Sequence, residues 1–206
     1  MGALKSGAFP VELNGKEYGL LFSLNALDEV QEKFGGYDKL SEVFNKDNPN
    51  LFKDTRWLLT LLINEALLAE DENAQLLEEK RVGRLIHAGN LQEVQNAIFK
   101  SFYRGTAGDN SDTENENDGE ENNRRGKQGS RAGKLDTARL LYIAVVLLRY
   151  REREAWRKTP YQITTLFKYH KEYNPHIFRQ EQAGTPAATE NMDDIDIALG
   201  AFNYGR

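Results

Sequence analysis

The sequence predicts a mainly α-helical protein: an N-terminal β-hairpin packed on a small helical domain, a disordered linker and a short C-terminal helical module. Three observations predict this fold class. Two short apolar stretches flank Asn14-Gly15, several longer segments repeat apolar residues at helical spacing, and residues 109–134 contain no large apolar side chain. The 206 residues suffice for one ordinary domain or two small ones.

The hairpin is predicted from its turn. Asn14-Gly15 is the dipeptide that best tolerates the positive φ angles of a two-residue type I′ turn. Pairing across this turn sets Val11 opposite Tyr18 and Phe9 opposite Leu20, so the apolar side chains share one face. Pro10 cannot donate a ladder hydrogen bond, which favours an edge strand.

Helices follow the hairpin. Ser23 or Asn25 is the predicted N-cap of a helix that stops at Gly35-Gly36. A short helix is expected over residues 37–44, and a long one with a wide apolar stripe over residues 52–70.

Two more helices complete the predicted N-terminal domain. One runs over residues 74–87. The other starts at Asn90, which forms a capping box with Glu93, and it continues through Phe102.

The middle of the chain changes sign. Residues 109–121 hold seven acids and no base, and residues 124–134 hold five bases and no acid. Such a polar, glycine-rich stretch cannot bury enough apolar surface to fold, so it is predicted to be a tether. The predicted organisation is a hairpin-and-helix domain (1–103), a disordered linker (104–134), a helical module (135–179) and a flexible acidic tail (180–206).

In the C-terminal module, Asp136 is the predicted cap of a helix running to about Tyr150. Thr159-Pro160-Tyr161-Gln162 is a strong helix start, with Thr159 as N-cap, Pro160 in the first turn and Gln162 closing a capping box. Two or three helices make a small bundle, which is a poor scaffold for catalysis.

No pattern in the sequence points to catalysis or to a metal. The chain has no cysteine, and its three histidines lack the spacing of paired ligands. Catalytic residues, cofactors and metals are therefore not expected, and neither is enzymatic activity. The longest apolar run, residues 140–148, is far shorter than the ~20 residues that span a bilayer. The start of the chain lacks the apolar core of a secretory signal, so we expect a soluble intracellular protein.

Charge leaves one alternative open. Residues 1–103 carry 11 bases and 16 acids, whereas residues 134–179 carry 10 bases and 4 acids. Tyrosines and Trp156 are interleaved with these bases, which suits single-stranded nucleic acid. Glu152 and Glu154 alternate with arginines, however, as on an ordinary solvated helix face. A small nucleic-acid-binding or regulatory protein is therefore the second hypothesis.

Two stretches carry a family resemblance. "GKEYGLLFSLNALDEVQEKFGGYDKL" (residues 15–40) resembles the opening of the tail assembly chaperones of long-tailed phages. "LLYIAVVLLRYREREAWRKTPYQITTLFKYHKEYN" (residues 140–174) resembles the C-terminal extension of their longer form, with its Trp-x-x-Thr-Pro helix start. Both stretches stand in the expected order around a polar linker.

The resemblance implies a function. Residues 1–103 would be the chaperone domain, which keeps the tape-measure protein soluble in the bacterial cytoplasm and is absent from the mature virion. The extension would recruit subunits of the major tail-tube protein, and a ribosomal frameshift would produce the longer form. Self-association, but no membrane or nucleic-acid partner, is expected.

Partner contacts are predicted on two helical segments. For each residue, simple packing in the core is at least as strong an alternative. The candidates are Trp57, Leu58, Leu61, Leu62, Trp156, Tyr161, Phe167 and Tyr169.

Overall fold

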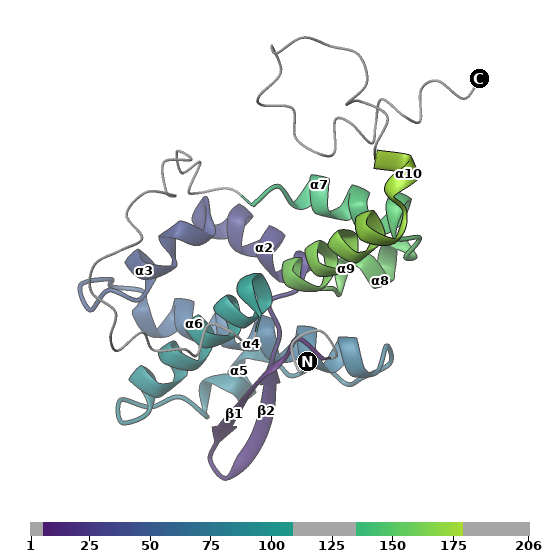
Figure 1. The fold of residues 1–206 in the computed structure, drawn as a ribbon. Coiled ribbons are helices and arrows are strands. Elements are labelled where there is room, and N and C mark those ends of the chain that lie inside the picture. The colour runs from purple at the N-terminus through teal and green to yellow at the C-terminus, as the bar shows by residue number, and fades with distance from the viewer. Residues whose placement is uncertain (1–5, 109–134, 179–206) are drawn as a thin grey trace, which may run out of the picture. The chain divides into compact units, whose positions relative to one another are not determined.

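The computed structural model describes residues 6–108 and 135–178 (Figure 1). It is mostly helical (64%) with a two-stranded antiparallel hairpin at the N-terminus, which confirms the predicted fold class. The chain divides into two compact units, Met1–Ile163 and Thr164–Arg206. Most of the predicted tether (104–134) and all of the predicted acidic tail (180–206) lie outside the described residues, but residues 104–107 of the predicted tether belong to helix α6 (Leu91–Ala107).

The hairpin has the predicted register. Strands β1 (Phe9–Leu13) and β2 (Lys16–Leu20) pair with Val11 opposite Tyr18 and Phe9 opposite Leu20. Asn14 and Gly15 have φ angles of 53° and 75°, as a type I′ turn requires. The turn extends past the helices (Figure 1).

The first helix begins and ends as predicted. In α2 (Leu24–Phe34), the Ser23 hydroxyl accepts a hydrogen bond from the N–H of Ala26 at 3.1 Å. Gly35 ends the helix with φ of 81°, a left-handed conformation in which a side chain is strained. The predicted short helix forms as η1 (Tyr37–Lys39) followed by α3 (Leu40–Val43).

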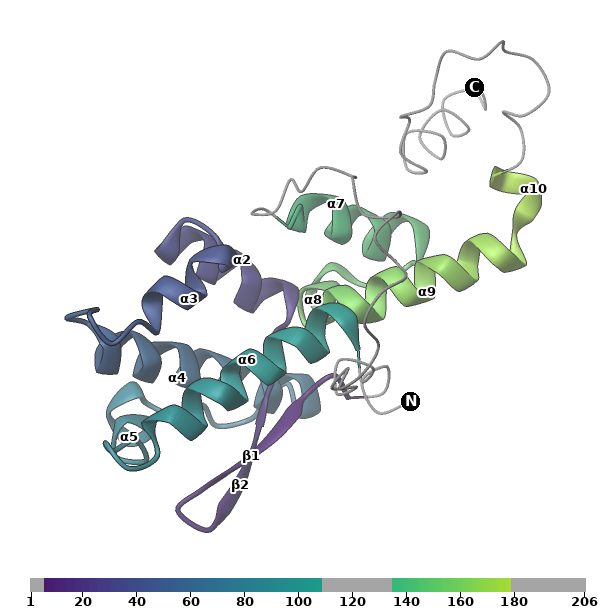
Figure 2. The ribbon, with the colours of Figure 1, turned by 60° about the vertical axis from the view of Figure 1, so that its left-hand side comes forward.

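Two long helices hold the hairpin. Helix α4 (Leu51–Glu70) lies against β2, and α6 (Leu91–Ala107) lies against β1 (Figure 2). The N–H of Leu21, just after β2, donates to the carbonyl of Leu62 at 3.1 Å. The hydroxyl of Ser101 on α6 donates to the carbonyl of Leu20 at 2.9 Å. The core between these elements contains fully buried side chains of Leu20, Phe22, Leu24, Leu27, Leu58, Leu59, Leu62, Ile63 and Ile98.

Two predictions in this region are wrong. Only α5 (Glu79–Gly83) is helical within residues 74–87. The side chain of Asn64 explains the difference, because it accepts from the N–H of Leu77 at 2.8 Å and donates to its carbonyl at 3.1 Å. These bonds take the backbone groups that a helix would use.

The predicted capping box at Asn90 does not form either. Asn90 is the N-cap of α6, but its side chain makes no capping hydrogen bond. It instead accepts from the N–H of His87 at 2.8 Å and donates to the carbonyl of Leu85 at 2.8 Å. The asparagine therefore shapes the preceding loop.

The helix predicted from Asp136 to about Tyr150 starts correctly, since Asp136 accepts from the N–H of Arg139 at 2.9 Å. Regular winding ends early: α7 (Thr137–Tyr142) passes into the π-helical turn η3 (Ile143–Leu147). The N–H of Leu148 bonds to the carbonyl of Ile143, five residues back, and Arg149 has a positive φ of 62°. The expected single helix is therefore broken before α8 (Glu152–Trp156).

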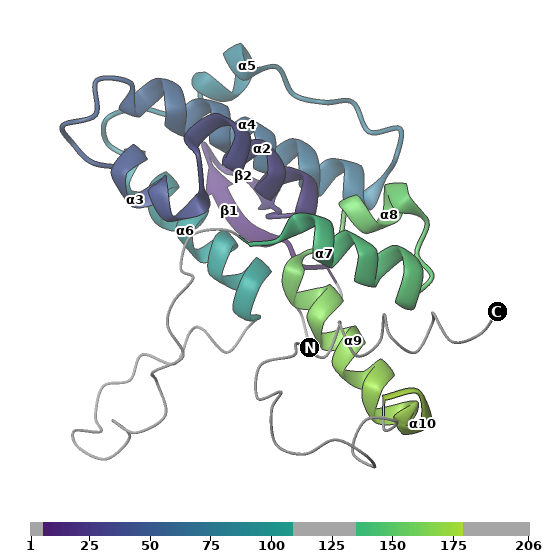
Figure 3. The ribbon, with the colours of Figure 1, turned by 90° about the horizontal axis from the view of Figure 1, so that it is seen from above.

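Within the first unit, residues 135–163 pack against α2 (Figure 3). The N–H of Leu24, in the first turn of α2, donates to the carbonyl of Lys158 at 2.9 Å. Glu72, just after α4, forms ion pairs with Arg153 (2.9 Å) and Arg157 (3.2 Å). A backbone carbonyl distant in sequence thus satisfies an N–H that the helix itself leaves unpaired.

The predicted start of α9 (Pro160–Tyr173) is confirmed. Thr159 Oγ1 accepts from the N–H of Gln162 at 3.2 Å, and Gln162 Oε1 accepts from the N–H of Thr159 at 3.0 Å. Both residues are buried. This reciprocal pair is the capping box that the sequence predicts.

The second unit, as far as it is described, contains the rest of α9 and α10 (Pro175–Phe178). Phe178 packs edge-on against Phe167, with ring centroids 6.1 Å apart, and against His170 at 6.0 Å. The side chain of Asn174 donates to the carbonyl of His170 at 2.8 Å, which closes the end of α9.

Candidate protein-binding surfaces

The apolar stripe of α4 is divided between core and surface. Leu58 and Leu62 are completely buried, so the core of the first unit takes up both side chains. Trp57 and Leu61 are half-buried on the side next to it. Of the four residues predicted on this helix, only Trp57 and Leu61 can therefore meet a partner without opening the core, and their role stays a prediction.

Trp57 belongs to a small aromatic cluster. Its ring packs edge-on against Phe34 of α2, with centroids 5.6 Å apart. The Lys33 ammonium lies 4.0 Å from the Trp57 centroid and 5.5 Å from that of Phe34. A half-buried indole with a cation on its face is a common anchor in protein interfaces, where an apolar ring meets a polar rim.

A buried polar cluster joins α2 to α4. The hydroxyl of Ser23 and the amide of Asn25 both donate to the carboxylate of Glu65, the latter at 2.9 Å. Asn25 also donates to Glu29 at 3.3 Å. Burial, and then the negative charge of Glu65, raise the pKa of Glu29. The hydrogen bonds fix the start of α2 on α4, so we assign this cluster to the scaffold.

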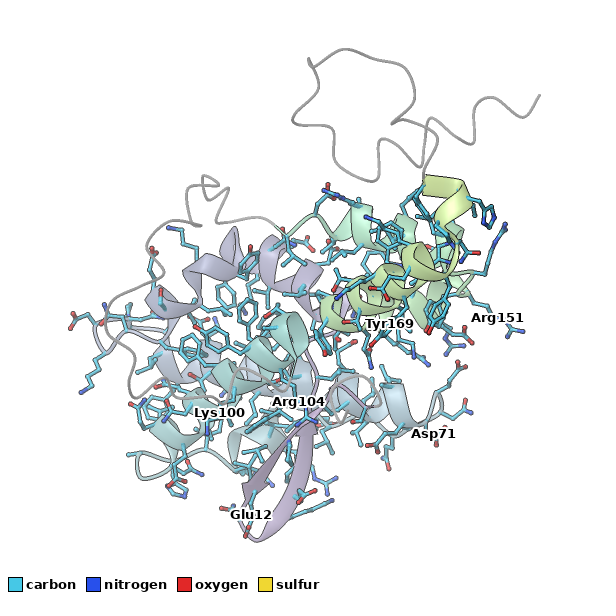
Figure 4. All side chains as sticks on the ribbon, in the orientation of Figure 1. Glu12, Asp71, Lys100, Arg104, Arg151 and Tyr169 are labelled. Atoms are coloured by element: carbon cyan, nitrogen blue, oxygen red, sulfur yellow. The ribbon has the colours of Figure 1, made fainter. Side chains whose placement is uncertain are left out.

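The four candidates on the C-terminal side differ in exposure. Trp156 and Tyr161 are half-buried in the first unit. In the second unit Phe167 is buried at 9% exposure, whereas Tyr169 is 45% exposed. The side chain of Tyr169 is therefore the most accessible of the four (Figure 4). Partner contact by any of them stays a prediction.

A groove beside β2 is a surface that the sequence reasoning missed. It has a volume of about 410 Å³ and is bordered by Lys16–Gly19 of β2, by Ile63, Ala66, Leu67 and Glu70 of α4, and by Gln75, Leu77 and Arg81. Successive side chains of a strand point to opposite faces, so a cavity touching four consecutive residues lies along the edge of the strand. One feature of the sequence points to this groove: Pro10 in β1 cannot donate a ladder hydrogen bond, whereas β2 has no proline.

A second cavity, of about 350 Å³, lies between the end of α4 and α8. Its lining mixes acids such as Glu70 and Glu154 with Arg157 and Lys158, beside small apolar side chains. Arg157 is already paired with Glu72, so this lining offers less free charge than its composition suggests.

No cluster of three or more potential metal ligands occurs in residues 6–108 and 135–178. Within the same ranges, no helix is both long enough and apolar enough to cross a bilayer.

No family model, curated protein or solved structure matches this chain.

Proposed function

We propose that the chain is a tail assembly chaperone of a long-tailed phage or prophage. It binds the tape-measure protein, keeps it soluble in the host cytoplasm and helps to recruit tail-tube subunits. The observation that carries the proposal is the structure of the two stretches that resemble this family. The first contains the turn residue Gly15, strand β2 of the hairpin and the capped helix α2, and the second contains the capped start of α9 at Pro160.

Exposed aromatic and apolar side chains support a role in binding proteins. Aromatic side chains are enriched at protein interfaces, and exposed apolar patches often mark binding sites. In the described residues, the large apolar side chains that are more than a third exposed are Phe52 (51%), Leu76 (48%), Tyr103 (54%), Val146 (36%), Tyr169 (45%) and Tyr173 (81%). A client with exposed apolar segments can be masked by such contacts, and no reactive group is needed.

Co-expression with the tape-measure protein tests the proposal. The chain should raise the soluble fraction of that protein and co-purify with it. Trp57→Ala should weaken co-purification, because it removes the half-buried indole between Lys33 and Phe34. Lys53→Ala, which shortens an exposed polar side chain elsewhere on α4, is the matched control. Absence of both solubilisation and co-purification by the wild-type chain would exclude the proposed function.

One observation favours the second hypothesis, nucleic-acid binding. Arg149 and Arg151 are exposed and form no ion pair within the described part of the chain, and Arg151 points into solvent (Figure 4). Binding of a fluorescent single-stranded DNA that weakens steeply between 50 and 200 mM salt, and is lost in the Arg149→Ala/Arg151→Ala double variant, would support this hypothesis. Equal binding by wild type and double variant would exclude these arginines as the site.

A further inference from the structure

We propose that the groove beside β2 binds an extended peptide segment of a partner protein as a third strand of the sheet. The inference concerns how a segment binds, and it does not depend on the client proposed above. It rests on the hydrogen-bonding register of the hairpin, on the side chains that line the groove and on the unequal protection of the two sheet edges.

The register leaves backbone groups of β2 unpaired. In a two-residue hairpin the pair next to the turn, Leu13 and Lys16, exchanges hydrogen bonds, and pairs then alternate. Glu17 and Gly19 are therefore in non-hydrogen-bonded pairs, so their N–H and C=O groups point away from β1. Within the described residues no other group bonds to them. An added strand would satisfy these donors and acceptors.

The two edges of the hairpin differ. On β1 the outward-pointing position opposite Gly19 is Pro10, which has no N–H to offer. A helix lies against each strand, α6 against β1 and α4 against β2, so the proline is what distinguishes the two edges. On β2 the groove runs along the edge that carries Glu17 and Gly19. A strand can therefore add to β2, whereas β1 is protected in the way natural sheet edges often are.

The lining of the groove indicates which side chains the segment carries. A Cβ placed on Gly19 would lie 3.2 Å from the Cβ of Ala66, so the face bearing Glu17 and Gly19 is directed towards α4. On that side the partly exposed apolar side chains of the groove are Leu67 and Leu77, beside the buried Ile63 and Ala66. A third strand should therefore present an apolar residue at every second position, directed at α4.

The rim of the groove is charged. Lys16 and Arg81 are exposed, as are Glu17 and Glu70, and none of the four forms an ion pair in the described structure. A segment with charged residues of both signs flanking its apolar positions complements this rim.

A second copy of the chain fits less well. Two β2 strands that pair antiparallel about a two-fold axis turn equivalent faces to the same side of the sheet. The second copy would then direct only Glu17 and Gly19 towards the apolar lining of α4, leaving that lining without an apolar partner. We therefore assign the groove to a partner segment with alternating apolar residues.

The test uses the full chain and a synthetic probe, acetyl-Lys-Val-Thr-Val-Thr-Val-Glu-amide. A peptide of the same composition with its three valines contiguous is the control probe. Amide hydrogen exchange followed by NMR should show protection of the Glu17 and Gly19 amides by the probe, with no change at Glu12. The control probe should protect them less.

A matched pair of variants makes the test specific. Glu17 and Glu12 are exposed partners in the same non-hydrogen-bonded pair, but only Glu17 lies on the β2 edge. Glu17→Pro removes the outward N–H and should weaken probe binding at least tenfold, whereas Glu12→Pro should leave it unchanged. Exchange in the wild-type chain decides the matter if either variant fails to fold.

Three results would overturn the inference. The first is the absence of protection at Glu17 and Gly19 at saturating probe, and the second is equal binding by the two proline variants. The third is protection of these amides without probe that rises with protein concentration, which would assign the edge to a second copy.

Discussion

Two substitutions separate what the hydroxyl and the methyl group of Thr159 contribute to stability, because each removes one of these groups. Thr159→Val deletes the hydroxyl and keeps the shape, so the buried N–H of Gln162 loses the acceptor that lies 3.2 Å away. Loss of such a cap costs about 1 kcal/mol, and an unpaired buried N–H costs about 1–3 kcal/mol. Because these describe the same lost bond, we expect a total of about 2 kcal/mol.

Thr159→Ser is the complementary change. It keeps the hydroxyl and deletes the methyl group Cγ2, which packs close to Gly7: a Cβ built on that glycine would lie 2.9 Å from it. Removing one buried methyl group should cost about 1 kcal/mol.

Urea unfolding measures both free energies. For a unit of roughly this size, 2 kcal/mol corresponds to a fall in Tm of about 4–8 °C. Thr159→Val should be the more destabilising variant. Equal stability of Thr159→Val and wild type would refute the assignment of the hydroxyl as a cap.

Three further predictions concern the scaffold. Leu58→Ala should cost about 2–5 kcal/mol in free energy of unfolding, because Leu58 is fully buried. Leu61→Ala should cost clearly less, because Leu61 is half-buried. Equal costs by chemical denaturation would contradict the assignment of Leu58 to the core and Leu61 to the surface. Gly35→Ala should cost about 1 kcal/mol in the same assay through its φ of 81° alone, since a Cβ there meets no atom within 4 Å, and a stabilising effect would refute this. The pKa of Glu29 is raised in the folded state. At pH values just above the ordinary pKa of 4.5, the native protein therefore binds more protons than the unfolded chain. The contribution of Glu29 to stability consequently falls as the pH rises from that value through the folded-state pKa. Glu29→Gln should remove that fall, so the variant should lose less stability than wild type when the pH is raised from 4 to 7. The same pH profile of the denaturation midpoint in variant and wild type would contradict this prediction.

Local signals in the sequence explain much of the fold. The register of the hairpin follows from Asn14-Gly15, because only one pairing suits a two-residue type I′ turn. Ser23, Asp136 and Thr159 each cap a helix as predicted, since each places a side-chain oxygen where the first turn leaves N–H groups unpaired.

The wrong prediction of a helix over residues 74–87 depends on a contact between residues that are not neighbours in sequence. Residues 74–78 have helical periodicity, but Asn64 binds the backbone of Leu77 from 13 positions away. The change to π-helical winding at Ile143 has no cue in the sequence that we can identify.

The candidate sites were only partly predictable. The apolar stripe predicts that α4 is amphipathic. It does not predict that Leu58 is buried in the core while Trp57 is only half-buried, because the stripe is wider than the surface of α4 that contacts the core. The groove beside β2 requires α4, Leu77 and Arg81 to meet at one strand edge, and that depends on tertiary packing.

The most direct test of the proposed function is the aggregation of purified tape-measure protein, followed by light scattering after dilution from denaturant. The account predicts that equimolar full-length chain suppresses the scattering and that the two proteins elute together in size-exclusion chromatography. Unchanged scattering, with separate elution of the two proteins, would contradict it.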